Sequence, residues 1–249
     1  MSRISSLPIV DPALLPHVWR VADLASDQAG LPTGHPLLDQ SLPGGGWPPG
    51  SMIEVLQQRP GQHVWQLLLP GLVCAARHSV GPVVLVGAPY QPFGPSLKAQ
   101  GLPAERLLCI QAEKPSARLW AAEQALRCAE ASAVLAWLPE ARAEELRRLH
   151  MAARQQSRLL FVFRTWKARH EASPATLRLL VDGVDCLALH ILKRRGPPLL
   201  APLQLPARSS RLTALLQARK ASASRGAAPV PADPLDRRSH VLDRTASVA

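Results

Sequence analysis

Several features of common enzymes and secreted proteins are scarce or missing in this sequence. Aromatic residues make up 4% of the 249 residues, and none of the four cysteines (Cys74, Cys109, Cys128 and Cys186) pairs with another at a C-x-x-C spacing. That spacing is typical of zinc sites and redox pairs, so we expect neither. No apolar run reaches the roughly 18 residues of a membrane helix. The first residues, MSRISSLPIVDP, lack the apolar core of a signal peptide, so we expect a cytoplasmic protein without membrane contact.

Lysine is rare, and this excludes the commonest nucleotide-binding motif. A phosphate loop reads G-x-x-x-x-G-K-[ST], because backbone amides and the lysine hold the phosphates and the hydroxyl holds magnesium. No lysine in this chain follows a glycine. The G-x-S-x-G and H-E-x-x-H motifs are missing too. Isolated histidines such as His63 and His150 are interpreted as structural, so we expect no catalytic residues, no metal and no cofactor.

Positive charge is abundant. The chain has 29 Lys and Arg against 18 Asp and Glu, a formal net charge of +11, and arginine supplies most of it. Arginine forks suit phosphates and carboxylates, which favours nucleic acid or an acidic protein as partner. A GC-rich gene would give the same composition, so charge alone leaves both interpretations open.

The middle of the chain alternates short apolar runs with helical patterns. We expect strands at 51–56, 83–88, 107–111, 133–138 and 159–163, an exposed edge strand at 186–194, and a short helix or strand at 174–180. Between them we expect helices at 62–78 (interrupted near Pro70 and Gly71), 94–101, 117–132 and 140–156. Alternation of this kind predicts one α/β domain with a mostly parallel sheet.

The two ends differ from this core, which we place at residues 31–206. Residues 1–30 carry an apolar stretch around Leu14–Leu24 that predicts an N-terminal helical segment. Residues 207–249 are rich in Ala, Ser, Pro and Arg, which predicts a basic, largely disordered tail. Leu212, Leu215 and Leu216 have the spacing of a weak amphipathic helix and are the candidate tail anchor for a partner.

The segment TGHPLLDQSLPGGGWPPGSMIEVL, from Thr33 to Leu56, resembles the opening of the RecA recombinase core. There a TG…LD…LGGG.P.G pattern leads into the first strand and then the phosphate loop. The stretch AQGLPAERLLCIQ at 99–111 is similar to the approach to the next strand of that core. The resemblance implies a RecA-like three-layer domain.

A closer resemblance is to the ImuA proteins, RecA/SulA-like accessory factors of damage-induced translesion DNA synthesis. It rests on LLLPGL, WAAEQALR with AVLAWL, RRLHMAAR with LFVFR, ASPATLRL and LHILKRRGPP, spread over about 30–200. It implies a non-catalytic adaptor in the SOS response. The implied partners are ImuB, an inactive Y-family polymerase homologue, an error-prone replicative-type polymerase, and RecA.

Aligned with the RecA family, this chain lacks the residues of ATP hydrolysis. The phosphate loop is degenerate and becomes Gln57, Gln58, Arg59, Pro60, Gly61, Gln62, His63 and Val64. The lysine position falls on or beside His63 and the hydroxyl position on Val64. Pro89 stands where the catalytic glutamate is expected, and Trp137 or a neighbour where the metal-supporting aspartate is expected. Phosphoryl transfer depends on positioned charge and metal, so we expect no ATPase activity.

Two basic groups are candidate contacts for weak, nonspecific DNA binding or for a partner. The first follows the strand at 159–163 and comprises Arg164, Trp166, Lys167 and Arg169, beside His170, where the resemblance places a DNA-contacting loop. The second comprises Lys193, Arg194 and Arg195. A solvated loop with Trp166 packed inward is the other interpretation of the first group.

Two other functions remain open. One is a SulA-like inhibitor of cell division in the SOS response, which binds the tubulin-like division protein. The other is an ATP-binding regulator with an unusual nucleotide pocket.

Overall fold

The architecture comes from a computed structural model that describes residues 29–128, 130–183, 186–199, 201–206 and 218. The strands are β1 Met52–Gln57, β2 Val83–Val86, β3 Leu107–Ile110, β4 Ala133–Trp137, β5 Leu159–Thr165, β6 Leu177–Asp182, β7 Leu187–Lys193 and β8 Leu203–Leu205. The α-helices are α1 Pro36–Ser41, α2 Val64–His78, α3 Gly94–Ala99, α4 Pro115–Arg127 and α5 Ala143–Gln155. Short 3₁₀ helices cover Ala104–Arg106 and Trp166–His170.

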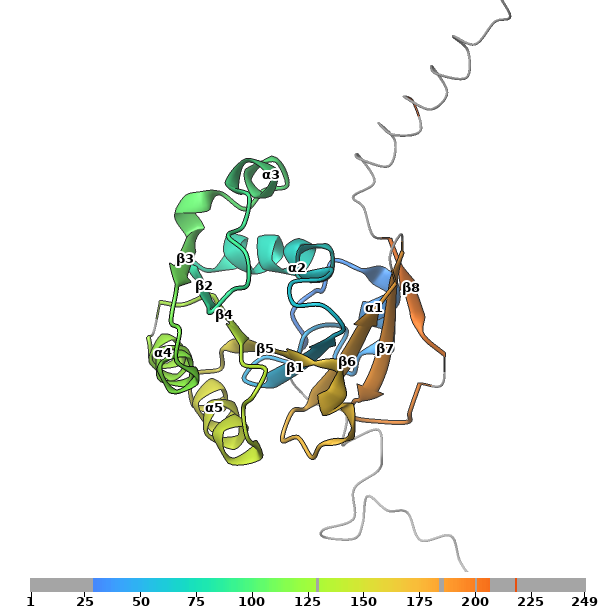
Figure 1. Ribbon diagram of the computed structural model, residues 1–249. Helices are drawn as coiled ribbons and strands as arrows, with labels where there is room; N and C mark the ends of the chain where they lie inside the picture. Colours follow the sequence, from blue (N-terminus) through green and yellow to red (C-terminus); the bar gives the residue numbers. More distant parts are fainter. Residues whose placement is uncertain (1–28, 129, 184–185, 200, 207–217, 219–249) are drawn as a thin grey trace, which may run out of the picture. The chain divides into compact units, whose positions relative to one another are not determined.

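The strands form one mostly parallel eight-stranded sheet in the order β3-β2-β4-β5-β1-β6-β7-β8 (Figure 1). The pairs from β3 to β6 are parallel, and β7 and β8 add antiparallel strands at one side. The predicted α/β class with a mostly parallel sheet is confirmed. The segment at 174–180, left open between helix and strand, forms β6 beside the central β1.

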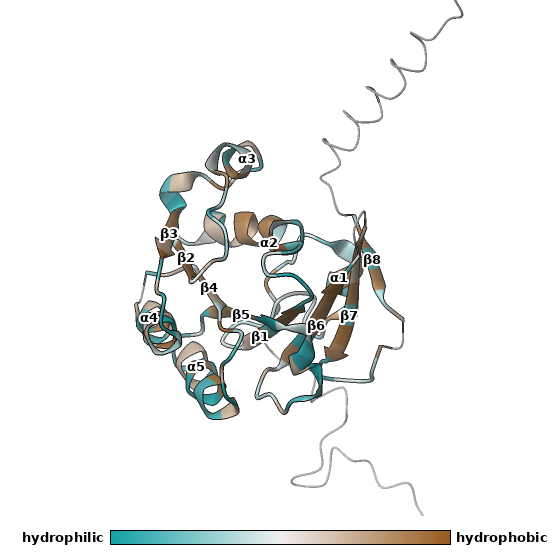
Figure 2. Ribbon diagram, viewed as in Figure 1, coloured by the Kyte–Doolittle hydropathy of each residue, from teal (hydrophilic) through white to brown (hydrophobic). Residues whose placement is uncertain are grey.

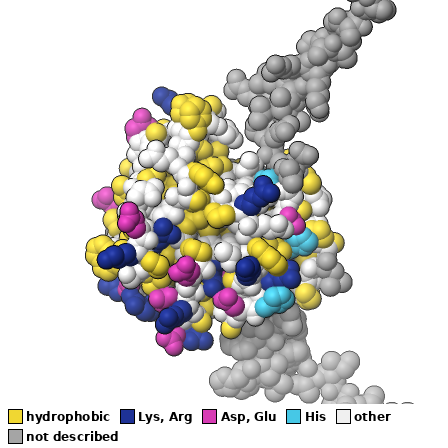
Figure 3. Space-filling view, in the orientation of Figure 1, with side chains coloured by type: hydrophobic (Ala, Val, Ile, Leu, Met, Phe, Trp, Pro, Cys, Tyr) yellow, Lys and Arg dark blue, Asp and Glu magenta, His cyan; other side chains and the backbone are white. Residues whose placement is uncertain are grey.

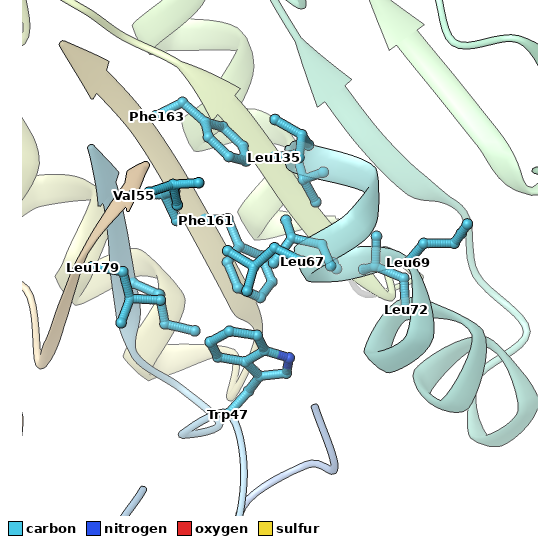
Figure 4. Close-up of a cluster of buried hydrophobic side chains, with 14 of the residues drawn as sticks. Trp47, Val55, Leu67, Leu69, Leu72, Leu135, Phe161, Phe163 and Leu179 are labelled. Carbon is cyan, nitrogen blue, oxygen red and sulfur yellow. The ribbon is translucent and has the colours of Figure 1, made fainter. Parts of the chain in front are cut away.

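Helices cover both faces of the sheet, which is why its central strands are buried throughout and mostly apolar (Figure 2). On one face α2 packs its leucines against β1, β4 and β5, together with Trp47, which meets the edge of Phe161 at a ring distance of 5.2 Å (Figure 4). On the other face α4 and α5 pack over Met52, Val134 and Val162. None of the described helices has the length and unbroken hydrophobicity that a membrane crossing requires.

Two sequence expectations need correction. The stretch at 186–194 is not an edge strand, because β8 pairs with β7 on its far side. Helix α2 is not interrupted either, since it continues through Pro70 to His78. Proline cannot donate to the carbonyl four residues before it. The imidazole Nε2 of His35 instead lies 3.0 Å from the Gln66 oxygen and 3.2 Å from that of Leu67, so it donates to the carbonyls of the turn that precedes Pro70.

The loop before α1 has a packing role that explains its composition. Gly34 has a positive φ of 80°, and a Cβ there would lie 2.3 Å from the Cβ of Pro70. The Thr33 amide donates to the Asp39 carboxylate at 2.9 Å, which fixes the loop against α1. The T-G…L-D pattern therefore seats this loop on the proline turn of α2. The predicted N-terminal helix at 14–24 and the tail with Leu212, Leu215 and Leu216 lie outside the described residues.

Candidate functional site

The degenerate loop, Gln57–Val64, leaves the carboxyl end of β1 and enters α2. It closes on itself through Gln57, whose Nε2 donates to the Gln62 carbonyl at 2.5 Å and whose Oε1 accepts from the Gly61 amide at 3.3 Å. Gly61 and His63 both have positive φ, at 80° and 54°. The loop is thus a tight turn shaped by its own side chains.

The same loop is tied to the connection after β6. Nε2 of His63 and Nε2 of Gln62 both donate to the Gly183 carbonyl, at 2.7 and 2.8 Å. The ring nitrogen that faces this connection is therefore occupied, and Val64 is buried in the core. His63, at the lysine position, thus connects the loop to the segment after β6, and Val64, at the hydroxyl position, packs in the core.

Pro89 and Trp137 border a small apolar pocket at the same edge. The pocket holds about 250 Å³ and its rim includes Tyr90 and Phe93, which are 73% and 71% exposed. Trp137 stacks on Phe163 at 4.4 Å. Figure 3 shows hydrophobic side chains at the surface at the top of the view, where Figure 1 places α3. Where the recombinase resemblance places acidic catalytic side chains, this chain has a proline, Pro89, and a buried aromatic ring, Trp137.

Arg164 belongs to a buried ionic cluster and not to a surface loop, so its prediction as a DNA contact is wrong. It lies in β5, is 5% exposed, and donates to Glu54 at 3.0 Å and to Glu171 at 2.6 Å. Arg178 donates to the other Glu54 oxygen at 2.5 Å and to the carbonyls of Ala168 and Glu171. Burial lowers the pKa of Arg164, but bonds and charges from Glu171 and Glu54 outweigh it and raise the pKa above its usual value.

The rest of the first basic group is at the surface. The 3₁₀ helix Trp166–His170 leaves Trp166, Lys167 and Arg169 exposed. The Arg169 guanidinium lies 4.9 Å from the centre of the Trp166 ring, and its Nε donates to His170 Nε2 at 2.8 Å. Trp166 is therefore not packed inward, but Arg169 occupies one side of its ring.

The second basic group lies beside a cleft that the sequence did not reveal. Arg194 and Arg195, just after β7, share a cavity of about 430 Å³ with His150 and Arg154 of α5 and with Ser157, which follows that helix. Lys193 donates to the Ser173 carbonyl at 3.1 Å. We call this cavity the basic cleft. A signal for it existed, because His150 and Arg154 are four residues apart on a helix and so share one face.

His150 is held neutral at the wall of the basic cleft. Its Nδ1 accepts from the Met52 amide at 3.2 Å. Burial lowers its pKa first, and the charges of Arg154 and Lys193 lower it further.

This pKa predicts a loss of stability in mild acid. The unfolded chain takes up a proton at His150 near pH 6.5, the usual histidine value, whereas the folded protein does so only at lower pH. The stability contributed by neutral His150 is therefore fully present above about pH 6.5, and it is lost as the pH drops toward the pKa of His150 in the folded protein. We expect His150→Asn, whose Oδ1 can still accept from Met52, to lose less stability than the wild type between pH 7.5 and 5. Urea unfolding at both pH values measures this, and equal losses would contradict it.

Comparison with known proteins relates the middle of this chain to a described family. Residues 50–159 match the model of the family described as cell division inhibitor SulA. Among solved structures, SulA from Pseudomonas aeruginosa is 26% identical, with 45% of this chain and 97% of that chain covered and a TM-score of 0.38. No curated protein matches. The segment from Gly50 to Leu159 is therefore SulA-like.

Proposed function

We propose that this chain is a non-catalytic, SulA-like protein of the SOS response that acts by binding a partner protein. The observation that carries the proposal is the SulA family match over residues 50–159. That segment runs from Gly50, two residues before β1, to the first residue of β5, and so includes α2, α3, α4 and α5. The match supports a cell-division inhibitor more directly than a translesion adaptor. The partner would then be the tubulin-like division protein.

The loop at 57–64 supports action without catalysis. A RecA-like ATPase needs a lysine and a hydroxyl at the turn between the first strand and the next helix, which here joins β1 to α2. His63 and Gln62 are instead bonded to Gly183, and Val64 is buried. Pro89 and Trp137 line an apolar pocket, in which a magnesium ion would find no oxygen ligands from these two side chains.

A specific observation also favours the second candidate, an adaptor in translesion DNA synthesis. The resemblance to ImuA proteins continues beyond residue 159 through ASPATLRL and LHILKRRGPP, which form β6, β7 and the basic end of β7. These strands lie outside the family match, yet they complete the sheet beside β1. The partners would be an ImuB-type polymerase homologue, an error-prone replicative-type polymerase, and RecA.

Purified full-length protein can decide between these partners. As an inhibitor it should suppress polymerisation of the division protein in proportion to its concentration, followed by light scattering. As an adaptor it should leave polymerisation unchanged and co-purify with the ImuB-type protein. In both cases ATP turnover should stay at the buffer level with and without single-stranded DNA, with the RecA recombinase as positive control. ATP hydrolysis that mutation of residues 57–64 abolishes, or no interaction with any of these partners, would contradict the proposal.

A further inference from the structure

The basic cleft lies at the edge of the sheet opposite the degenerate loop. Its walls are the residues that precede β1, β5 and β6 and those that follow β7. Ligands of open α/β sheets usually bind outside the carboxyl ends of the parallel strands, which is where the degenerate loop lies. The cleft is thus separate from the nucleotide position implied by the recombinase resemblance, and the SulA-like segment supplies only part of it, since Arg194 and Arg195 lie beyond residue 159.

The positive charge of the cleft is not neutralised by the described part of the chain. Arg154, Arg194 and Arg195 all line it, no Asp or Glu does, and none of the three forms an ion pair with a described residue. This contrasts with Arg127, Arg148, Arg164 and Arg178, which all pair with carboxylates. Unpaired like charges repel one another, so an anion in the cleft would relieve that repulsion.

The three arginines come from two sides of the cleft, and Arg194 is fixed by hydrogen bonds. The Arg194 guanidinium donates to the carbonyls of Pro197 and Ser41, which fixes it between the β7–β8 connection and the end of α1. Arg154 stands on the last turn of α5. The carbonyls of Ala152, Ala153 and Arg154 already accept from the amides of residues 156–158, so the helix end offers few free acceptors to repel an anion.

The lining also indicates which anion fits. Besides its arginines and His150, the cleft is walled by Gly, Pro, Ser, Thr and Leu residues, and no Phe, Tyr or Trp lines it. It therefore lacks the large aromatic rings that stack on bases or anchor a peptide in most binding sites of those kinds. Arginine forks match the oxygens of a phosphate group, and a tetrahedral phosphate can be met from several sides.

We propose that the basic cleft binds phosphate groups through Arg154, Arg194 and Arg195. The phosphates belong either to a nucleic-acid backbone or to a small phosphorylated molecule, since both present the same oxygens. Binding through the backbone alone is independent of base sequence and weakens steeply with salt. This role is independent of the protein partner, so its test and that of the proposed function can fail separately.

The test compares the full-length protein with the Arg154→Gln/Arg195→Gln double variant. Both side chains are exposed, so their loss should leave the fold intact, whereas Arg194 also holds Ser41 and Pro197. A labelled oligo-dT strand measures backbone binding by anisotropy across a salt series. Inorganic phosphate and pyrophosphate measure small-molecule binding by the shift in Tm. Arg77→Gln is the control, because Arg77 is an exposed arginine on α2 and does not line the cleft.

If the phosphates are those of a strand, the double variant should bind oligo-dT about tenfold or more weakly. Its slope of log K against log salt should flatten by about 1.4, at about 0.7 for each lost contact. If they are those of a small molecule, the Tm shift with phosphate or pyrophosphate should disappear in the double variant and persist in Arg77→Gln. Two results would overturn the proposal. One is that the protein binds neither oligo-dT nor phosphate nor pyrophosphate, or that the double variant and Arg77→Gln lose binding equally. The other is that polyglutamate binds as tightly as the phosphate probes and that the double substitution weakens its binding equally, since the cleft would then accept any polyanion.

Discussion

Replacing Glu54 with Gln should lower the free energy of unfolding by about 3–5 kcal/mol. Glu54 is fully buried in β1, and its two oxygens accept from Arg164 and Arg178. The amide is nearly isosteric but neutral, so two buried guanidiniums would keep their charges with less compensation. Removing one partner of a buried ionic cluster costs far more than the intact cluster contributes, because the remaining charges stay desolvated.

A matched control exists on α4. Glu123 also bridges two arginines, Arg127 and Arg148, but both partners are 63% exposed. Water can solvate them after Glu123→Gln, so that variant should lose about 1 kcal/mol or less. Urea denaturation followed by circular dichroism measures both losses. If Glu54→Gln were as stable as Glu123→Gln, the cluster would not be the structural element inferred here.

The Glu54 cluster also explains how the basic 3₁₀ helix is held. Arg178 donates to the carbonyls of Ala168 and Glu171, and Arg164 donates to Ala141 and the Glu171 carboxylate. The segment that carries Trp166, Lys167 and Arg169 is thus attached to the sheet through two guanidiniums. We expect Glu54→Gln to increase proteolytic cleavage near Lys167 in addition to its effect on stability.

The strands of the sheet could be predicted from the sequence because the central strands are buried on both faces. Runs such as VVLV at 83–86 and AVLAW at 133–137 have no polar side, which indicates parallel strands covered by helices. Strand β8 is only three residues long, which is too short to give a periodic hydrophobic pattern. Because the sequence therefore does not indicate β8, it predicts β7 as an edge strand. The sequence alone predicts an interruption of α2 at Pro70, because the residues around Pro70 do not reveal that His35, far away in the sequence, donates hydrogen bonds to this helix.

The candidate contacts were predicted less well, and for a consistent reason. A run of charges shows that arginines are present but not whether a carboxylate from another strand neutralises them. Glu54 is 110 residues from Arg164 in the chain, so Arg164 was interpreted as a surface residue. Arg194 and Arg195 are near the surface and line the basic cleft, but Arg154 and His150, which complete its wall, come from a helix some 40 residues earlier.

The contact between His35 and the proline turn of α2 gives the second large expected effect. His35 is 5% exposed, and its Nε2 donates to the carbonyls of Gln66 and Leu67. A buried carbonyl without a partner costs about 1–3 kcal/mol. We therefore expect His35→Ala to lower the free energy of unfolding by about 2–4 kcal/mol, measured by urea denaturation.

Pro70→Ala tests whether the missing helix bond is the cause. Alanine at this position restores an amide that can donate to the Gln66 carbonyl, and it keeps the Cβ that packs against Gly34. In the Pro70→Ala background, His35→Ala should cost about 1–2 kcal/mol less than in the wild type, because one of the carbonyls then has a partner within the helix. If the two substitutions were additive within about 0.5 kcal/mol, His35 would stabilise the loop only through its burial, and the continuity of α2 through Pro70 would need another explanation.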